Sequence, residues 1–293
     1  ERKIRVLLVD GCDRQTLPLA RVYRKSGFLV TTLNSSKLDN GYASRYPNIK
    51  ILDKKIKDKT YHIKKIKELL SSGNYDVAIS TSDDTCEGLS LMKEEIGKKC
   101  SIAVVNPDLF YKAYDKNITM KVCMENGIPC PKTYCDIGSF DEIPWNLFSY
   151  PMVVKPKMSY GAIGFRVFDN ETSMKTFFEG LTCEIDDFVF QEYIPQTVIQ
   201  YECAMFIDEQ GNVKTACVFS KNRWFPVSGG SSTCNVTVDR PDIVDSCSRL
   251  LSSIGWRGAC DIDLINLYKA AAKYAADCTG RIKDSKYIYK EHF

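Results

Sequence analysis

Histidine is nearly absent from this chain, which holds two histidines among 293 residues. Both, His62 and His292, are expected at the surface, so chemistry centred on histidine is disfavoured. The 13 cysteines are scattered without a C-x-x-C pair, which argues against a zinc site and against a disulfide framework. Many unpaired cysteines suit a reducing compartment, so we expect a cytoplasmic protein.

Long apolar runs and the common phosphate-binding motifs are also missing. No segment approaches the length needed to span a bilayer, so no membrane partner is expected. The motif G-x-x-x-x-G-K-[ST] does not occur, and the apolar run Ile4–Val9 is followed by Asp10-Gly11-Cys12-Asp13 instead of G-x-G-x-x-G. These absences disfavour the P-loop fold and the dinucleotide-binding fold.

The charge of the chain is nearly balanced, with 40 basic and 37 acidic residues and a formal charge of +3. Such a balance gives no reason to expect nucleic acid as a partner. Lysines cluster between residues 50 and 67, where they could bind an anionic partner. Apolar residues recur among them at helical spacing, at Ile63, Ile66, Leu69 and Leu70. The pattern favours an amphipathic helix whose lysines face water.

The length and a hydrophobic content of 44% indicate two or three compact units. From Ile4 to Val105, short β-rich runs alternate with helical patterns, which predicts a parallel α/β domain. A helix start at Asn106-Pro107-Asp108 marks a boundary, after which hairpin-like strands dominate. We therefore predict an α/β domain over 1–107 and an α+β domain over 108–293, with a subdomain over about 133–192.

The most informative segment has a lysine at the end of one β-rich run and then a loop of small residues. The runs Met152–Val154 and Phe165–Phe168 predict a hairpin whose loop is too long for a simple turn. Lys155 supplies a compact positive charge, while Gly161 and Gly164 let backbone N–H groups approach an anion. A triphosphate fits these features, although a surface hairpin with an ordinary tip has the same pattern.

Further candidates lie before and after this segment. In chain order they are Lys116, Gln191-Glu192-Tyr193-Ile194, Glu202, Lys221, Arg223, Asp261 and Asp263. The two aspartates stand two residues apart in a β-rich run, so they share one face of a strand, about 7 Å apart along it. Carboxylates so placed suit a hard cation such as Mg²⁺.

This ordered series resembles the ATP-grasp superfamily, in particular its branch similar to carbamoyl-phosphate synthetase and biotin carboxylase. The resemblance covers residues from about 4 to 265 and implies a pre-ATP-grasp α/β domain followed by an ATP-grasp domain with a lid. It implies that Lys155 and the loop Ser159 to Gly164 cover the ATP phosphates. Lys116 takes the place of a second phosphate-facing lysine.

The resemblance also implies roles at the hinge between lid and core. Glu192, which follows Gln191, would accept a hydrogen bond from the adenine amino group. The backbone of Tyr193 and Ile194 would contact the edge of the ring. Glu202, on the next strand, would bind the ribose hydroxyls.

The segment Arg257-Gly258-Ala259 resembles the family segment before the first magnesium ligand. That match implies that Asp263 binds Mg²⁺ and that Asp261 is an outer-sphere alternative. Lys221 and Arg223 are the catalytic candidates, because positioning and charge neutralisation need cations and no histidine base.

Each candidate also has a purely structural interpretation. Lys116 could be a solvated lysine in the first turn of a helix, and Glu192 an exposed acid at a strand end. Glu202 could form a cross-strand ion pair, and Lys221 with Arg223 could mark a solvated strand end. The two aspartates could be solvated acids on a half-exposed strand.

The chain departs from the family pattern at one important point. The family carries Glu-x-Asn-Pro-Arg on a second strand, but here Ile265 leads into Asn266-Leu267-Tyr268 and an alanine-rich helical pattern to about Cys278. Either turnover has been lost, or a segment is missing between Ile265 and Asn266, and we expect the second. The acceptor pocket is expected in loops such as Pro226 to Asn235.

The expected function is an ATP- and Mg²⁺-dependent ligase that activates a carboxylate as an acyl phosphate for attack by an amine or a similar nucleophile. Its expected cofactors are ATP and Mg²⁺, and its expected partners are small carboxylate and amine substrates, with a second copy of the chain as a candidate partner. Two alternatives stay open. One is a carbamoyl-phosphate synthetase-like subunit that uses bicarbonate, and the other is a non-catalytic nucleotide-binding protein.

Overall fold

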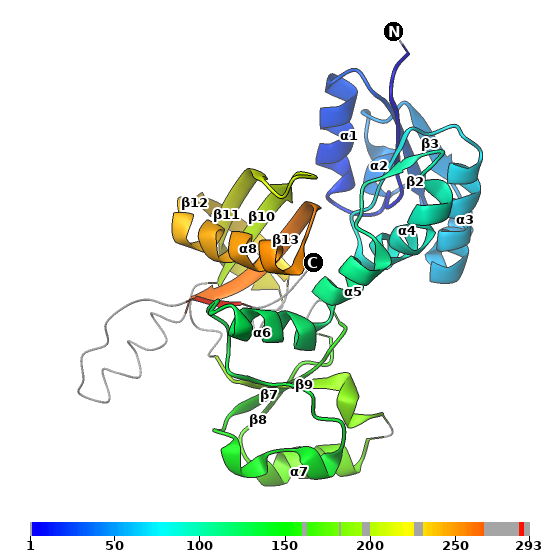
Figure 1. The fold of residues 1–293 in the computed structure, drawn as a ribbon. Helices are drawn as coiled ribbons and strands as arrows, with labels where there is room; N and C mark the ends of the chain where they lie inside the picture. The colour runs from blue at the N-terminus through cyan, green and yellow to red at the C-terminus, as the bar shows by residue number, and fades with distance from the viewer. Residues whose placement is uncertain are drawn as a thin grey trace. The chain divides into compact units, whose positions relative to one another are not determined.

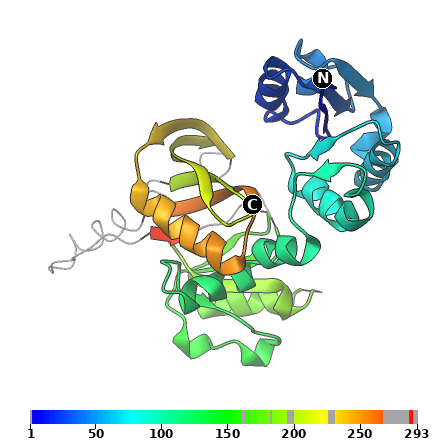
Figure 2. The same cartoon turned by 45° about the horizontal axis from the view of Figure 1, so that its top comes forward.

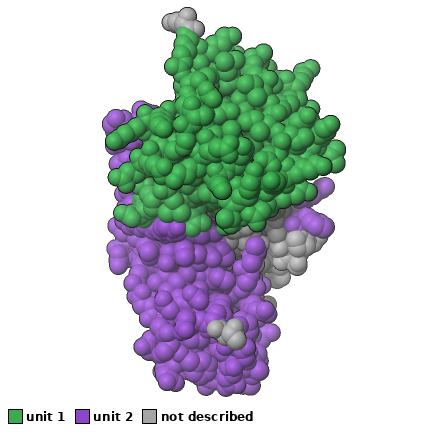
Figure 3. Space-filling model, turned by 90° about the vertical axis from the view of Figure 1, so that its right-hand side faces the viewer, with its two compact units in different colours: residues 1–110 green, residues 111–293 purple. Residues whose placement is uncertain are grey.

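The structure, a computed structural model, describes residues 2–159, 163–181, 183–194, 200–225, 231–266 and 287–289. The chain divides into an N-terminal unit, residues 1–110, and a C-terminal unit, residues 111–293 (Figure 3). The predicted domain limits, at 107 and 108 with a lid over about 133–192, stay predictions. Within the described residues, no helix combines the length and the apolar character that crossing a membrane requires.

The N-terminal unit is a parallel sheet with helical connections (Figure 1). Its elements are β1 (Arg5–Leu8), α1 (Thr16–Lys25), β2 (Leu29–Asn34), α2 (Asn40–Ala43), β3 (Ile49–Leu52), η1 (Lys54–Lys57), α3 (Lys59–Ser71), β4 (Val77–Ile79), α4 (Asp83–Ile96) and β5 (Ser101–Ile102). The strand order is β3-β2-β1-β4-β5, and every neighbouring pair is parallel. The predicted parallel α/β fold is confirmed.

Alternation along β1 divides its apolar side chains between two helical layers. Leu7 belongs to a buried cluster with α3 and α4, whereas Leu8 packs with Ala20 of α1. The lysine-rich stretch forms α3, as predicted, and its apolar side is fully buried at Ile66 and Leu70. The buried apolar face packs this helix against the sheet, while its lysines lie on the face toward water.

The C-terminal unit contains two antiparallel sheets. After α5 (Pro107–Tyr114), which crosses the boundary, its elements are α6 (Lys116–Glu125), β6 (Thr133–Tyr134), η2 (Phe140–Glu142), η3 (Trp145–Leu147), β7 (Met152–Pro156), β8 (Arg166–Phe168), α7 (Glu171–Glu179), η4 (Ile185–Asp187), β9 (Phe188–Glu192), β10 (Gln200–Ile207), β11 (Val213–Phe225), β12 (Ser231–Val238), α8 (Pro241–Ile254), β13 (Gly258–Asn266) and β14 (Tyr287–Tyr289). We call the sheet β6-β9-β7-β8 the lid sheet and the sheet β12-β11-β10-β13-β14 the core sheet.

The lid sheet buries one face against α7 (Figure 1). Met152 and Val154 of β7 pack there with Phe190 of β9 and with Met174 and Phe178 of α7. Because side chains alternate along a strand, the residues between them project from the opposite face. The pattern of β7 and β9 therefore fixes which residues of the lid can meet a ligand.

The core sheet is covered on one face by α8, as Figure 1 and Figure 2 both show. The helix ends at Gly255, which adopts the left-handed conformation at φ 80°. Its buried side includes Cys247 and Leu250, and the buried residues Cys203 of β10 and Ile262 of β13 alternate with polar ones. The polar residues therefore lie on the face away from α8.

Three expectations about the second half of the chain are wrong, stay predictions or fall outside the described residues. Residues 231–235, expected in a loop, belong to β12, and β11 continues to Phe225. The expected missing segment between Ile265 and Asn266 stays a prediction; the two residues are consecutive in β13, where Ile265 pairs with Gln200 of β10 and both residues pair with β14. The helical pattern expected up to about Cys278 lies outside the described residues.

The pH dependence of folding tests the pairing of β1 with β4. Asp76, just before β4, accepts hydrogen bonds from the guanidinium and the backbone N–H of Arg5. These bonds lower the pKa of Asp76 to about 2, below the usual value of about 3.9. A lowered pKa stabilises the fold above about pH 4, and the contribution disappears as the pH falls through about 2.

We predict that Asp76→Asn lowers the free energy of unfolding by about 1 kcal/mol near pH 6, because solvent screens this partly exposed pair. The difference from the wild type should shrink between about pH 4 and pH 2. Urea unfolding at several pH values measures it. A difference that is constant over this range would contradict the assigned pairing.

Candidate functional site

Lys155 lies on the open face of the lid sheet. Its neighbours along β7 point into the aromatic core, so Lys155 projects from the other face together with Val189, its partner on β9. Only 7% of Lys155 is exposed. A lysine that is so deeply buried needs polar or charged partners for its ammonium group. A lysine at the exposed tip of a surface hairpin would not need them.

Gln191 shares this face of the lid sheet. It is paired with Val153, two residues before Lys155, and its side-chain amide donates to the Thr133 hydroxyl over 2.8 Å. Both residues are buried. The lid sheet thus presents a lysine and an anchored amide side by side on adjacent strands.

The loop after β7 meets Lys116 of α6. The ammonium of Lys116 donates to the backbone oxygens of Ser159 over 2.7 Å and of Lys157 over 3.3 Å. Asp115 caps α6 by accepting from the backbone N–H of Asn117, so Lys116 begins the helix at a fixed position. With 5% exposure, Lys116 is not a solvated surface lysine.

Gly164 ends this loop in a conformation that needs glycine. Its φ is +77°, and a Cβ there would approach Pro156 Cγ to 2.6 Å. Ser159 contributes its carbonyl oxygen to Lys116. Gly161 lies outside the described residues, so its expected contact with phosphate stays a prediction.

The hinge residues make bonds of their own in this structure. Glu192 exchanges two bonds with Lys132, because its carboxylate accepts from the Lys132 N–H over 2.7 Å and its own N–H donates to the Lys132 oxygen. The N–H of Tyr193 donates to the Pro151 oxygen, so it is already used. Ile194 is buried, with 8% exposure. Contact of these residues with adenine stays a prediction.

Four polar residues gather on the core-sheet face away from α8. Glu202 of β10 stands directly opposite Asp263 of β13, and Asp261 lies two pairs further along, on the same face. The ammonium of Lys221, on β11, makes ion pairs with Asp263 and, over 3.3 Å, with Glu202. The cross-strand ion pair considered for Glu202 is therefore present, and Lys221 is not at a solvated strand end.

Burial and crowding change the protonation of this cluster. Burial raises the pKa of Asp261 to about 9, with further contributions from its hydrogen bond to Glu202 and from the negative charges of Glu202 and Asp263. Asp261 is therefore protonated at neutral pH and donates to Glu202. Burial lowers the pKa of Lys221, but the charges of Asp263 and Glu202 outweigh it and raise the pKa above its usual value. The four groups together carry one net negative charge.

The cluster suits Mg²⁺ held jointly with a nucleotide better than a resident metal. The Oδ1 atom of Asp261 is buried and has no hydrogen-bond partner in the described part of the chain, and a cation would satisfy it. Among the described residues, however, no three acidic, histidine or cysteine side chains are placed to hold a metal ion by themselves. One or two carboxylates with phosphate oxygens are the usual Mg²⁺ ligands.

The strand pairing around Arg223 is irregular, unlike the pairing in this cluster. The pairing of β11 with β12 shifts between Lys221 and Arg223 and again after Arg223, so their side chains cannot be assumed to share a face. Arg223 is exposed. Its predicted catalytic role stays a prediction.

Sequence patterns did not single out the polar groups at the carboxyl edge of the N-terminal sheet. Asp10 follows Val9, the residue after β1, and is buried, where it accepts hydrogen bonds from Thr81 and Thr85. An acid immediately after a buried parallel strand was the available signal, because this edge is where α/β proteins bind ligands.

A family model described as "ATP-grasp domain" matches residues 113–285, which is more than half of the chain. No curated protein matches the chain.

Solved structures share the fold at low sequence identity. Biotin carboxylase from Campylobacter jejuni is 15% identical with a TM-score of 0.75, over 98% of this chain and 65% of that one. An MgADP and bicarbonate complex of the biotin carboxylase domain of Hydrogenobacter thermophilus 2-oxoglutarate carboxylase is 14% identical with a TM-score of 0.74, over 98% and 63%. L-amino acid ligase from Bacillus licheniformis is 15% identical with a TM-score of 0.65, over 90% and 63%.

The present chain thus spans less than two thirds of the length of each of these three proteins. At such identities the likeness concerns the fold alone. The match over residues 113–285 and the lid and core sheets lead to one conclusion: the chain belongs to the ATP-grasp family.

Proposed function

We propose that this chain is an ATP- and Mg²⁺-dependent ligase that converts a carboxylate into an acyl phosphate, which an amine or a similar nucleophile then attacks. The observation that carries the proposal is the placement of two buried lysines, Lys116 and Lys155, at the loop that follows β7. Two buried cations at one loop suit a polyanion. Membership of the ATP-grasp family supports a nucleoside triphosphate as that polyanion.

The core-sheet cluster supplies the second half of the proposed site. Asp263, with Asp261 beside it, would hold Mg²⁺, which draws negative charge from phosphate oxygens when bound. Lys221 would neutralise charge that develops on the transferred phosphoryl group, and Glu202 keeps its ammonium in place through their ion pair. Together with Gln191 to Ile194 at the hinge and Glu202 at the ribose, these residues form the proposed nucleotide site.

A second candidate function rests on the ion pair between Lys221 and Asp263. Here the charge of Asp263 is already compensated, and the chain lacks the family's Glu-x-Asn-Pro-Arg motif. A protein that binds nucleotide without turnover would have both features. ADP release in the presence of amino acids and small carboxylates supports the ligase, whereas nucleotide binding without ADP release supports this alternative.

Bicarbonate is a further candidate substrate, by analogy with the biotin carboxylase domain solved with MgADP and bicarbonate. That structure is of a dimer, which keeps a second copy of this chain among the proposed partners. Bicarbonate-dependent ADP release without any other carboxylate would select this version of the proposal.

The first prediction of the proposed function concerns Lys155. Lys155→Ala should weaken ATP binding by about 1.5 to 3 kcal/mol, roughly 10- to 150-fold, because a charge-assisted contact to phosphate is lost. Isothermal titration calorimetry measures the affinity. Lys175→Ala, which removes an exposed lysine of the lid helix α7, is the matched control and should bind ATP normally. Equal affinity of the Lys155 variant and the wild type would remove the phosphate assignment.

The second prediction compares the two aspartates of β13. Asp263→Asn should bind nucleotide in weakened form and lose most Mg²⁺-dependent ADP formation, because asparagine keeps an oxygen but not the charge. Asp261→Asn should do less, since Asp261 is proposed only as an outer-sphere ligand of the metal. Asp245→Asn, at an exposed position of α8, is the control. A greater loss from Asp261→Asn at saturating Mg²⁺ would transfer the metal role to Asp261.

A further inference from the structure

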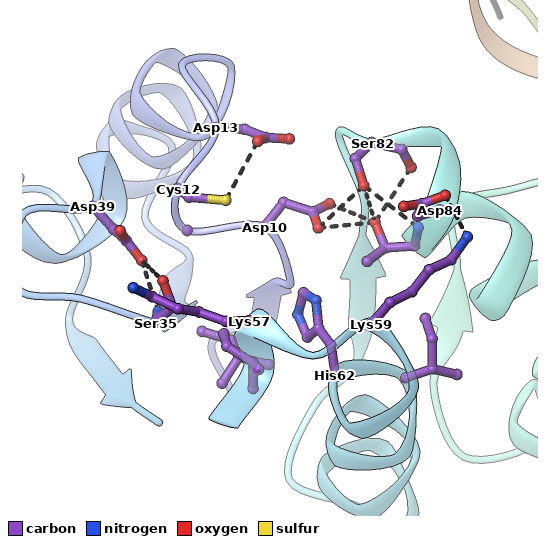
Figure 4. Close-up of a pocket in the computed structure, with 15 residues that line it drawn as sticks. Asp10, Cys12, Asp13, Ser35, Asp39, Lys57, Lys59, His62, Ser82 and Asp84 are labelled. Atoms are coloured by element: carbon purple, nitrogen blue, oxygen red, sulfur yellow. Dashed lines mark hydrogen bonds and ion pairs between the residues drawn. The ribbon is translucent and has the colours of Figure 1, made fainter. Parts of the chain in front are cut away.

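The N-terminal unit contains a cavity of about 300 Å³. It lies at the carboxyl ends of the strands and is lined mostly by residues of the segments that follow β1, β2, β3 and β4 (Figure 4). Cavities of this size accept small molecules. None of the roles proposed above uses this cavity.

The cavity lies where the sheet topology favours a ligand. The strands β2 and β3 lie on one side of β1, and the next strands in the chain, β4 and β5, lie on its other side. The direction of the crossovers therefore reverses between β1 and β4. In open parallel sheets, ligands bind outside the carboxyl ends of the strands at such a reversal.

One acid at this point is structural. Asp10 is 4% exposed and accepts hydrogen bonds from the Thr81 N–H, the Ser80 hydroxyl and the Thr85 hydroxyl at 2.8, 3.0 and 2.7 Å. These bonds join the end of β1 to the segment after β4. Because its acceptor sites are used by the protein, Asp10 contributes negative potential and not a ligand contact.

Two other acids keep acceptor capacity toward the cavity. Asp39 uses Oδ2 for the N–H groups of Ser35 and Ser36 at 2.7 and 3.0 Å, and its Oδ1 has no hydrogen-bond partner among the described residues. Asp13 accepts from the Thr81 hydroxyl over 2.8 Å and has only the weak thiol donor of Cys12 on its other oxygen.

His62 adds a third acceptor on the wall opposite Asp10 (Figure 4). Its Nε2 lies 3.0 Å from the Val9 carbonyl oxygen, and only a protonated Nε2 can bond to a carbonyl. In the neutral ring Nδ1 is then an acceptor. The cavity therefore offers acceptors at Asp13, Asp39 and His62, alongside the ammonium of Lys57.

The charge of the lining is negative. Four aspartates line the cavity against two lysines, and one of these, Lys59, is already paired with Asp84 over 2.6 Å. The thiol of Cys12 responds to this field, since burial and then the charges of Asp13, Asp10 and Asp39 raise its pKa to about 12.

We propose that this cavity binds a small organic cation, with its ammonium group held by Asp13 and Asp39. An ammonium group has three donors and a positive charge, and it meets two carboxylates and the Nδ1 of His62 on the walls. The proposal concerns residues of the N-terminal unit alone. It goes beyond the proposed ligase and does not depend on it.

Calorimetry on the whole chain without nucleotide tests the proposal. The probe is 1,4-diaminobutane, and 1,4-butanediol and succinate are the neutral and anionic compounds of the same length. The diamine should bind and the other two should not. Binding of succinate, or equal binding of the diol and the diamine, would overturn the proposal.

Amide variants then locate the contact. Asp13→Asn and Asp39→Asn keep an acceptor oxygen but lose the charge, so each should weaken diamine binding roughly tenfold or more. Glu94→Gln removes an acid from an exposed position of α4 outside the cavity and should change nothing. If all three variants bind alike, the diamine binds the surface and the cavity assignment is wrong.

A variant that should bind the diamine more tightly is also needed, because misfolding of the amide variants would weaken binding whether or not the proposal is right. Lys57 lines the cavity and is exposed, so Lys57→Met removes a competing positive charge at little risk to the fold, and the diamine should bind more tightly. Weaker binding would contradict the proposal. Lys155→Ala and Asp263→Asn should bind the diamine normally, which separates this result from any failure of the proposed ligase.

Discussion

The buried ammonium of Lys221 between Glu202 and Asp263 is the constraint on which the core-sheet site depends. Removing a charged group from water costs several kcal/mol, and only close partners of opposite charge offset that cost. Glu202 comes from β10, which neighbours β11, and Asp263 comes from β13, the next strand beyond β10. Register between these strands is thus fixed by charge on one face and by α8 packing on the other.

The same cluster explains the neutral state of Asp261. Three carboxylates and one lysine on one buried face leave an unfavourable excess of negative charge, and protonation of one acid relieves it. Asp261 is the group that takes the proton, because it is buried and bonded to Glu202. A bound cation would relieve the excess negative charge of this face in the same way as the proton on Asp261 does. This excess of negative charge supports a metal role for the face more than any single side chain does.

Much of this arrangement follows from local sequence patterns. Alternation predicts the two faces of β7, and helical spacing with a terminal glycine predicts α8 and its end at Gly255. Each of these two signals involves only residues that are close together in the sequence. The ATP-grasp fold was predicted from the resemblance of the ordered series of polar residues to that family, and the order carried the prediction, because each member by itself also has a structural interpretation.

Other features depend on residues that are far apart in sequence. The pairing of Lys221 with Asp263 spans 42 positions and follows from the register of three strands, which no local pattern fixes. The bulges around Arg223 and the strand β12 were missed for the same reason. The bond from the Tyr193 N–H to Pro151 likewise arises from contact between segments that sequence reading treats separately.

Asp10, Asp261 and Asp39 take different roles, and residue type does not distinguish them. Asp10 is saturated by hydroxyl and backbone donors and so joins two strands. Asp261 is protonated by crowding, with one oxygen left unpaired. Asp39 has one oxygen bonded to its own loop, and the other faces a cavity. A carboxylate can bind a ligand only with the acceptor capacity that the fold leaves unused. The number of unused acceptor sites therefore distinguishes Asp10, which is structural, from Asp13 and Asp39, which can hold a cation.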